Sequence, residues 1–154
     1  MTTAGAIEFK RQTASGAEIL RHLIACDSSY TPPLSERVRL PDYAEKLSAR
    51  ALLFEAWHGD ALVGLVAAYA PPSPAPFFIS NVSVDPRFGG RSIATTLMRQ
   101  CICAARESNS SGLELEVSLF NRRARDLYGR LGFIPGTRTD THLSMALHLT
   151  SEST

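Results

Sequence analysis

The fold is decided by one stretch of the sequence, 82-VSVDPRFGGRSIA-94, which runs from a strand through a turn and small residues into a helix. Small residues such as Gly89 and Gly90 let a ligand approach the backbone closely, and the free N–H groups of a helix N-terminus attract phosphate. The stretch therefore predicts a cradle for a diphosphate, with a purely structural turn as the alternative. It lacks both the Walker ending Gly-Lys-Ser/Thr and the Gly-x-Gly-x-x-Gly spacing of a dinucleotide site.

The rest of the chain alternates apolar and polar residues with the periods of strands and helices. Before the cradle we predict a strand at 6–10, a helix from Thr13 or Ser15 to about Asp27, a helix from Pro41 through Arg50, strands at 51–58 and 61–69 joined by a Gly59-Asp60 turn, and a strand at 77–84. After it we predict a helix at 93–107, a strand at 113–117, a helix at 121–131 closed by Gly132, and strands at 133–135 and 142–149.

This order, β-α-α-β-β-β-α-β-α-β-β, predicts an α/β (α+β) fold with a mixed, mostly antiparallel central sheet of about seven strands, flanked by about four helices. With 154 residues and no sign of a repeat or linker, we expect a single domain spanning 1–154. Simple alternation along the 77–84 strand would put Phe78, Ser80, Val82 and Val84 on one face and Phe77, Ile79, Asn81 and Ser83 on the other.

The charge balance argues against a polyanionic partner. Lys plus Arg number 16 and Asp plus Glu 15, so there is no global field to attract nucleic acid or an anionic membrane. The arginines at 122, 123, 125 and 130 spread around their helix without interleaved aromatic residues, so we interpret them as a solvated face or as a docking site for a phosphate.

Cysteine usage and hydropathy indicate the compartment. The chain has three cysteines, Cys26, Cys101 and Cys103, with no His or Cys partner at zinc-ligand spacing, so we expect reduced thiols and no metal. Residues 1–10 lack an apolar signal core, and no run approaches the roughly 20 apolar residues of a membrane span. These observations predict a cytoplasmic location.

The stretch at 82–97 resembles the central motif of the GNAT superfamily of N-acetyltransferases, Val-x-Pro-x-x-Arg-Gly-x-Gly-Ile-Gly-x-x-Leu. The residues that match it in order are Val84, Pro86, Gly90, Ile93 and Leu97. Within the signature Arg/Gln-x-x-Gly-x-Gly/Ala, Ala94 conforms, Gly89 stands in place of the leading Arg, and Ser92 stands in place of the middle Gly. The resemblance implies acetyl-CoA as co-substrate, and Arg87 or Arg91 as the source of the missing charge.

A second block, 121-NRRARDLYGRLGF-133, looks like the family pattern Asn-x-x-Ala-x-x-x-Tyr-x-x-x-Gly-Phe at full register. Asn121, Ala124 and Tyr128 are spaced by three and four residues and therefore share one helical face. By the resemblance, Asn121 binds the pantetheine arm and Tyr128 protonates the departing thiolate. An isolated tyrosine at this spacing would be interpreted as a core residue, and the joint pattern favours the catalytic interpretation.

The resemblance also implies that the fourth and fifth strands separate and that the coenzyme pairs with the free strand edge. The implied coenzyme-binding residues are Val82, Ser83, Val84, Gly89, Gly90, Arg91, Ser92, Ile93, Ala94, Thr95, Asn121, Ala124 and Tyr128. The backbone N–H of Val82 or Val84 is the expected oxyanion donor, and Glu116 on the fifth strand is our candidate general base. None of the four histidines has a nearby Ser/Asp arrangement in the sequence, which disfavours a hydrolase triad.

We therefore predict an N-acetyltransferase that acts on a primary amine of a small molecule by direct attack in a ternary complex. A protein or peptide acceptor uses the same chemistry in a wider cleft and is the first alternative. The departures at Gly89 and Ser92 motivate a second alternative, a non-catalytic acyl-CoA-binding domain on the same fold. Because members of this family often pair through their C-terminal strands, a homodimer is a further expectation.

Overall fold

A computed structural model describes residues 6–30, 32–90 and 92–150. In these residues the chain forms seven strands and four α-helices in the predicted order. The strands are β1 (Glu8–Arg11), β2 (Leu52–His58), β3 (Ala61–Tyr69), β4 (Phe77–Val84), β5 (Gly112–Ser118), β6 (Ile134–Arg138) and β7 (His142–His148). The helices are α1 (Gly16–Cys26), α2 (Leu40–Arg50), α3 (Ile93–Glu107) and α4 (Arg122–Arg130).

The local signals act as predicted. Ser15 and Glu18 form a capping box at the start of α1, in which each side chain bonds the other residue's backbone N–H. Residues 27–29 and 34–36 form short 3₁₀ helices in the segment that connects α1 to α2. Gly59 takes a φ of +59° in the turn between β2 and β3, as a tight hairpin requires.

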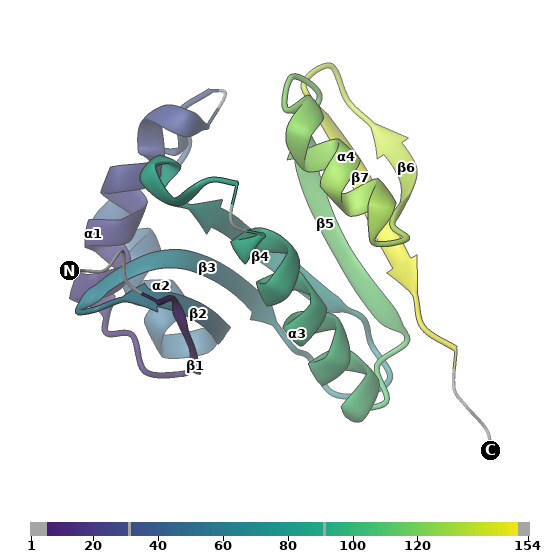
Figure 1. Ribbon diagram of the computed structural model, residues 1–154. Coiled ribbons are helices and arrows are strands. Elements are labelled where there is room, and N and C mark those ends of the chain that lie inside the picture. Colours follow the sequence, from purple (N-terminus) through teal and green to yellow (C-terminus); the bar gives the residue numbers. More distant parts are fainter. Residues whose placement is uncertain (1–5, 31, 91, 151–154) are drawn as a thin grey trace.

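One continuous sheet holds all seven strands in the order β1-β2-β3-β4-β5-β7-β6 (Figure 1). The strand pairs are antiparallel except β4 with β5, which run parallel because α3 crosses between them. The predicted mixed and mostly antiparallel sheet is thus confirmed.

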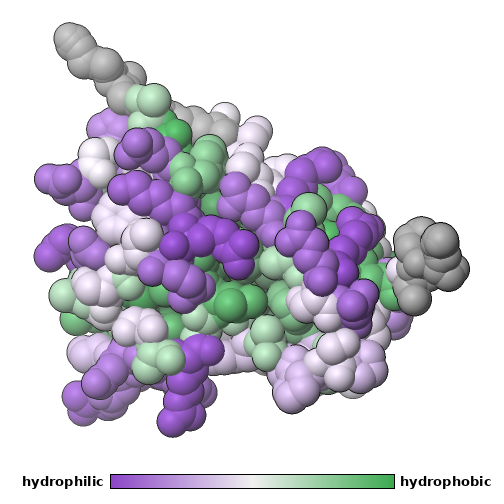
Figure 2. All heavy atoms as spheres, turned by 90° about the horizontal axis from the view of Figure 1, so that it is seen from below, coloured by the Kyte–Doolittle hydropathy of each residue, from purple (hydrophilic) through white to green (hydrophobic). Residues whose placement is uncertain are grey.

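Two apolar layers lie on opposite faces of the sheet. Helices α3 and α4 cover one face, with Leu97 and Met98 among the fully buried residues. Helices α1 and α2 cover the other face, where Leu23 and Leu47 are fully buried. Seen from below, the surface is mostly hydrophilic, with hydrophobic side chains between the polar ones (Figure 2).

Helix α3 approaches the sheet closely at Gly64 of β3. A Cβ atom on Gly64 would lie 2.6 Å from Cγ2 of Ile93, so a larger residue would push the start of α3 away from the sheet. The glycine therefore helps to fix the N-terminus of α3 beside the end of β4.

The strict alternation predicted for β4 is wrong beyond Ile79. Asn81 pairs with Ala67 and Ile79 with the adjacent Ala68, so Ser80 is an extra residue in a β-bulge. After the bulge, Val82 and Val84 pack against the same core as Phe77 and Ile79. Asn81 and Ser83 turn to the α1 face, because one inserted residue reverses the side-chain alternation.

Candidate active site

The cleft begins where β4 and β5 separate. Their pairing covers Phe77–Ile79 of β4 and Leu113–Leu115 of β5, and in the described part of the chain it ends at the Ser80 bulge. The hydroxyl of Tyr43 on α2 donates to the Ser80 carbonyl at 3.0 Å, and it lies 2.6 Å from the Ser80 hydroxyl. This anchor holds the bulge, and beyond it the strands enclose a cleft of about 610 Å³.

The edge of β4 that faces this cleft carries free backbone groups. The Asp85 N–H donates to the carbonyl of Val63 on β3 at 2.8 Å. Because hydrogen-bond directions alternate along an antiparallel strand, Ser83 also directs its backbone groups toward β3. The N–H groups of Val82 and Val84 therefore face the cleft. One of these two N–H groups is the predicted oxyanion donor.

The N-terminus of α3 closes one end of the cleft. Gly90 has a φ of +79°, and Ser92, the N-cap residue, has a φ of +58°. The Ser92 side chain makes no capping hydrogen bond to the described part of α3, and the first i to i+4 bond in this turn runs from Thr96 N to Ser92 O. The N–H groups of Ile93 to Thr95 are thus left for an anion.

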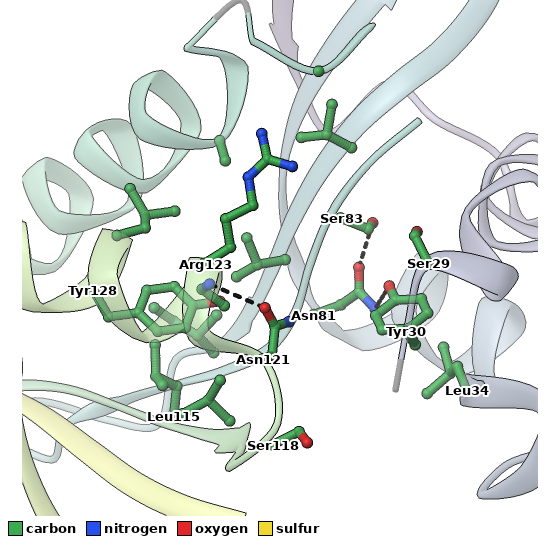
Figure 3. A pocket seen from close by; sticks show the side chains of 18 of the residues that line it. Ser29, Tyr30, Leu34, Asn81, Ser83, Leu115, Ser118, Asn121, Arg123 and Tyr128 are labelled. Carbon is green, nitrogen blue, oxygen red and sulfur yellow. Dashed lines mark hydrogen bonds between the residues drawn. The ribbon is translucent and has the colours of Figure 1, made fainter. Parts of the chain in front are cut away.

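Helix α4 forms the wall opposite β4 (Figure 3). Asn121 is the N-cap of α4, and its Oδ1 accepts from the Ala124 N–H at 3.0 Å. Tyr128, further along the same face of the helix, is 6% exposed, and burial raises the pKa of its phenol. Its hydroxyl makes no hydrogen bond to a described residue and is accessible from outside the protein interior. Because Tyr128 lines the cleft, the hydroxyl faces the cleft.

The structure gathers the predicted site in one place. The predicted residues that line the cleft are Val82, Ser83, Val84, Gly89, Gly90, Ser92, Ile93, Ala94, Thr95, Glu116, Asn121, Ala124 and Tyr128. Arg91 lies outside the described residues.

Three described arginines bring positive charge to the cleft. Arg37 lies in the segment between α1 and α2, and Arg123 and Arg130 lie on α4, where Arg123 extends between α4 and α3 (Figure 3). Arg87 instead binds Asp85 through Nη2 and Nε at 2.7 and 3.1 Å, and this contact holds the pKa of the Asp85 carboxyl below its usual value. The expectation that Arg87 supplies the charge is therefore not supported by its position.

Sequence reasoning missed a hydrogen-bond chain on the β4 wall. His22 Nε2 lies 2.8 Å from Ser83 Oγ. Ser83 Oγ donates to Asn81 Oδ1 at 2.7 Å, and Asn81 Nδ2 donates to the Tyr30 hydroxyl at 3.1 Å (Figure 3). No serine or aspartate lies near His22 in the sequence in a triad arrangement, and its serine partner comes from a distant strand. The two residues are 61 positions apart, so no sequence spacing could have revealed the contact.

Glu116 is exposed on β5 and lines the cleft, as its alternating position predicts. His142 at the start of β7 also lines the cleft, and its Nδ1 lies 2.9 Å from the Thr141 hydroxyl. Cross-strand pairing of Ser118 with His142 makes His142 a diagonal neighbour of Glu116. Sequence reasoning gave His142 no role in the site, because this proximity depends on strand register.

Among the described residues, no group of three or more His, Cys, Asp and Glu side chains could hold a metal ion. None of the described helices combines the length and apolar character needed to cross a membrane.

Comparison with known proteins agrees with this geometry. A family model described as the acetyltransferase (GNAT) family matches residues 17–133. N-alpha-acetyltransferase MAK3 of Arabidopsis thaliana is 35% identical over 89 residues, 56% of this chain and 47% of that protein. The matched segments span less than half the length of the curated relatives.

Solved structures share the fold. The ribosomal-protein-S18-alanine N-acetyltransferase of Escherichia coli superposes with a TM-score of 0.78 at 18% identity, covering 96% of this chain and 97% of that one. The PaiA N-acetyltransferase of Thermoplasma acidophilum, solved with coenzyme A, has a TM-score of 0.71 at 12% identity, covering 94% and 99%. The resemblance and the fold inferred from the sequence are thus confirmed, and the family match bears out the predicted acetyltransferase class.

Proposed function

Because the chain belongs to the acetyltransferase (GNAT) family, we propose that it transfers the acetyl group of acetyl-CoA to a primary amine of a small molecule. The observation that carries this proposal is the unpaired edge of β4, which lies between the N-terminus of α3 and the Tyr128 face of α4. The edge offers backbone hydrogen bonds, the helix N-terminus offers an anion site, and Tyr128 offers a proton.

The residues around the cleft fit an acyl-CoA. The N–H groups at the start of α3 would hold the diphosphate, and Arg123 or Arg130 would add positive charge. The Asn121 amide nitrogen would bind the pantetheine arm, since only its oxygen is used in capping α4 within the described residues. The edge of β4 would pair with the amides of that arm as an added strand does.

The transfer needs one nucleophile, one oxyanion donor and one acid. The neutral amine nitrogen attacks the thioester carbonyl, a C–N bond forms, and the C–S bond breaks. The N–H of Val82 or Val84 would stabilise the oxyanion, and Tyr128 would give its proton to the thiolate. Glu116 would take the surplus proton of the attacking amine, directly or through water.

The acceptor would enter between β5 and the segment that joins α1 to α2. On that side the cleft is lined by Ser29, Tyr30, Pro32, Leu34 and Arg37. The cleft of about 610 Å³ is within the usual range for small-molecule sites, and it has to hold the acyl end of the coenzyme as well as the acceptor.

A peptide N-terminus is the second candidate acceptor. The names of the Escherichia coli and Arabidopsis thaliana proteins favour it, since one is an S18-alanine and the other an N-alpha-acetyltransferase. For either acceptor class, the single domain, the cytoplasmic location and the homodimer remain predictions.

The first experiment is a thermal-shift titration with acetyl-CoA and CoA, with NAD and ATP as controls. At a hundredfold excess over Kd, a ligand that binds only the folded state adds about 2.7 kcal/mol of stability. We expect a selective shift with acetyl-CoA, followed by thiol release with a panel of arylalkylamines, polyamines, amino sugars and short peptides with free N-termini. Turnover of the peptides alone would favour the second acceptor class. A shift without turnover of any amine would indicate a binding domain, and no shift at millimolar acetyl-CoA would overturn the proposal.

A further inference from the structure

The hydrogen-bond chain behind the cleft starts on a residue that does not line it. His22 of α1 is 2% exposed, and both of its ring nitrogens lie near an oxygen, Nδ1 at 3.2 Å from the Leu62 carbonyl oxygen and Nε2 at 2.8 Å from Ser83 Oγ. Because Ser83 donates its one O–H to Asn81, the neutral ring donates from Nε2 to Ser83, and this bond fixes the ring. Cys26, one helical turn later, packs against it with Sγ 3.6 Å from Nε2.

The hydrogen-bond chain ends on a residue that lines the cleft. Ser83 donates to Asn81, and Asn81 Nδ2 donates to the phenol oxygen of Tyr30 at 3.1 Å. Tyr30 lies in the segment between α1 and α2, across the cleft from Tyr128 (Figure 3). Burial is the main cause that raises the pKa of Tyr128, and a smaller part comes from the charge that Tyr30 would carry. The two phenols are thus within electrostatic reach of each other.

The bulge at Ser80 is the reason that this hydrogen-bond chain is needed. It turns the polar side chains of Asn81 and Ser83 to the α1 face, where both are at least 94% buried. A buried polar group without a partner costs about 1–3 kcal/mol, so both need bonds within the protein. His22 and Tyr30 supply those bonds, one at each end.

The chemistry of attack explains what Tyr30 offers to an acceptor. The lone pair of a nucleophilic amine must point at the thioester carbon, so only its N–H groups remain to bind the wall. An N–H group needs an acceptor, and a phenol oxygen has two lone pairs. Asn81 occupies one of them, and the second is left for the amine.

We propose that Tyr30 binds the acceptor amine by accepting one of its N–H groups, and that His22 is a positioning residue that fixes Tyr30 through Ser83 and Asn81. This inference rests on the proposed function and adds the residues that orient the nucleophilic amine.

The test separates amine binding from coenzyme binding and from folding. Steady-state kinetics would use the panel amine with the highest kcat/KM as the probe, in wild type and in Tyr30→Phe, Ser83→Ala, His22→Leu and His22→Gln. Losing one neutral hydrogen bond should raise the amine KM of Tyr30→Phe about 2- to 10-fold, with the acetyl-CoA KM unchanged. Tyr69→Phe is the matched control, because the Tyr69 hydroxyl has no hydrogen-bond partner among the described residues and does not line the cleft.

The positioning role predicts a pattern that a structural role does not. Ser83→Ala should raise the amine KM by itself, yet add nothing in the double variant with Tyr30→Phe, because both break the same chain. His22→Leu should raise the amine KM, and His22→Gln, which keeps an N–H near Ser83, should restore most of it.

Two outcomes would overturn the inference in an active wild-type enzyme. One is an amine KM of Tyr30→Phe within twofold of wild type, and the other is strictly additive effects of Tyr30→Phe and Ser83→Ala. An inactive wild-type protein that does not bind acetyl-CoA would instead overturn the proposed function. An unchanged CoA midpoint shift in each variant would show that the variant is folded.

Discussion

The α4 wall of the cleft presents Asn121 and Tyr128 along one helical face, and the Tyr128 hydroxyl has no partner among the described residues. The β4 wall is bonded internally, from buried His22 through Ser83 and Asn81 to Tyr30. One wall keeps its hydrogen-bonding groups free for a ligand, and the other uses most of them to hold its own shape.

This difference separates two kinds of substitution. On the α4 wall, removing a free hydroxyl takes away a chemical group without breaking a contact, so activity should change and stability should not. On the β4 wall, removing a member of the chain leaves its neighbours buried without partners, so stability and acceptor binding should change together.

The largest expected effect is on the α4 wall. Tyr128→Phe should lower kcat at least 100-fold, because a general acid contributes about 10²- to 10⁴-fold, while the urea midpoint should stay within error. Since the pKa of Tyr128 is raised, wild-type kcat should show no alkaline fall from this group below its ordinary value of 10.0. Stopped thiol-release assays and urea titration measure both, with Tyr69→Phe as the control. A Tyr128→Phe enzyme within threefold of wild type would remove the residue from the proposed role.

The second prediction concerns the stability of the β4 wall against pH. Burial lowers the pKa of His22 from 6.5 to about 4, so the folded protein holds the ring neutral while the unfolded chain takes up a proton at higher pH. Protonation of His22 therefore does not lower the free energy of unfolding above pH 6.5. The free energy of unfolding decreases as the pH falls toward 4, by about 2 kcal/mol between pH 7 and pH 5. Urea titrations at these two pH values measure it.

The control for this pH effect is His22→Gln, which removes the titrating imidazole. It should be less stable at pH 7 but lose less on going to pH 5. The carboxyl of Asp85, with a pKa below 3.8, is a separate source of stability that is lost only at lower pH. Equal losses in wild type and His22→Gln would contradict the prediction.

The two walls also differ in how well the sequence predicted them. Asn121 and Tyr128 were found because their spacing is helical and local, and the bounds of α3 were found because its apolar period is equally local. The Ser80 bulge was missed because it depends on how β4 pairs with Ala67 and Ala68, which alternation within β4 does not contain.

The residues missed in the site follow from the same cause. Asn81 and Ser83 were assigned to the wrong face because one inserted residue reverses every later side chain in the strand. Ser83 was named, by the resemblance, as a coenzyme-binding residue; the structure places it at the cleft, with its side chain bonded to His22. The neighbours His142 and Glu116 meet through the register of β5 and β7, which a single sequence does not specify.

The smallest expected effect lies at the loop between β4 and α3, which closes one end of the cleft and where two adjacent glycines form a matched pair. Gly90 has a φ of +79°, which strains an L-residue, whereas Gly89 has a φ of −65° and an added Cβ would lie 3.5 Å from the Pro86 carbonyl oxygen, an ordinary contact. A left-handed residue with a Cβ costs about 1 kcal/mol, so Gly90→Ala should weaken CoA binding about fivefold by moving the start of α3. Gly89→Ala should bind CoA as wild type does, by isothermal titration calorimetry. If Gly89→Ala bound CoA more weakly than Gly90→Ala, the space at position 89 and not the backbone conformation at position 90 would determine CoA affinity. The absence of the family's Arg at Gly89 would then matter for that affinity.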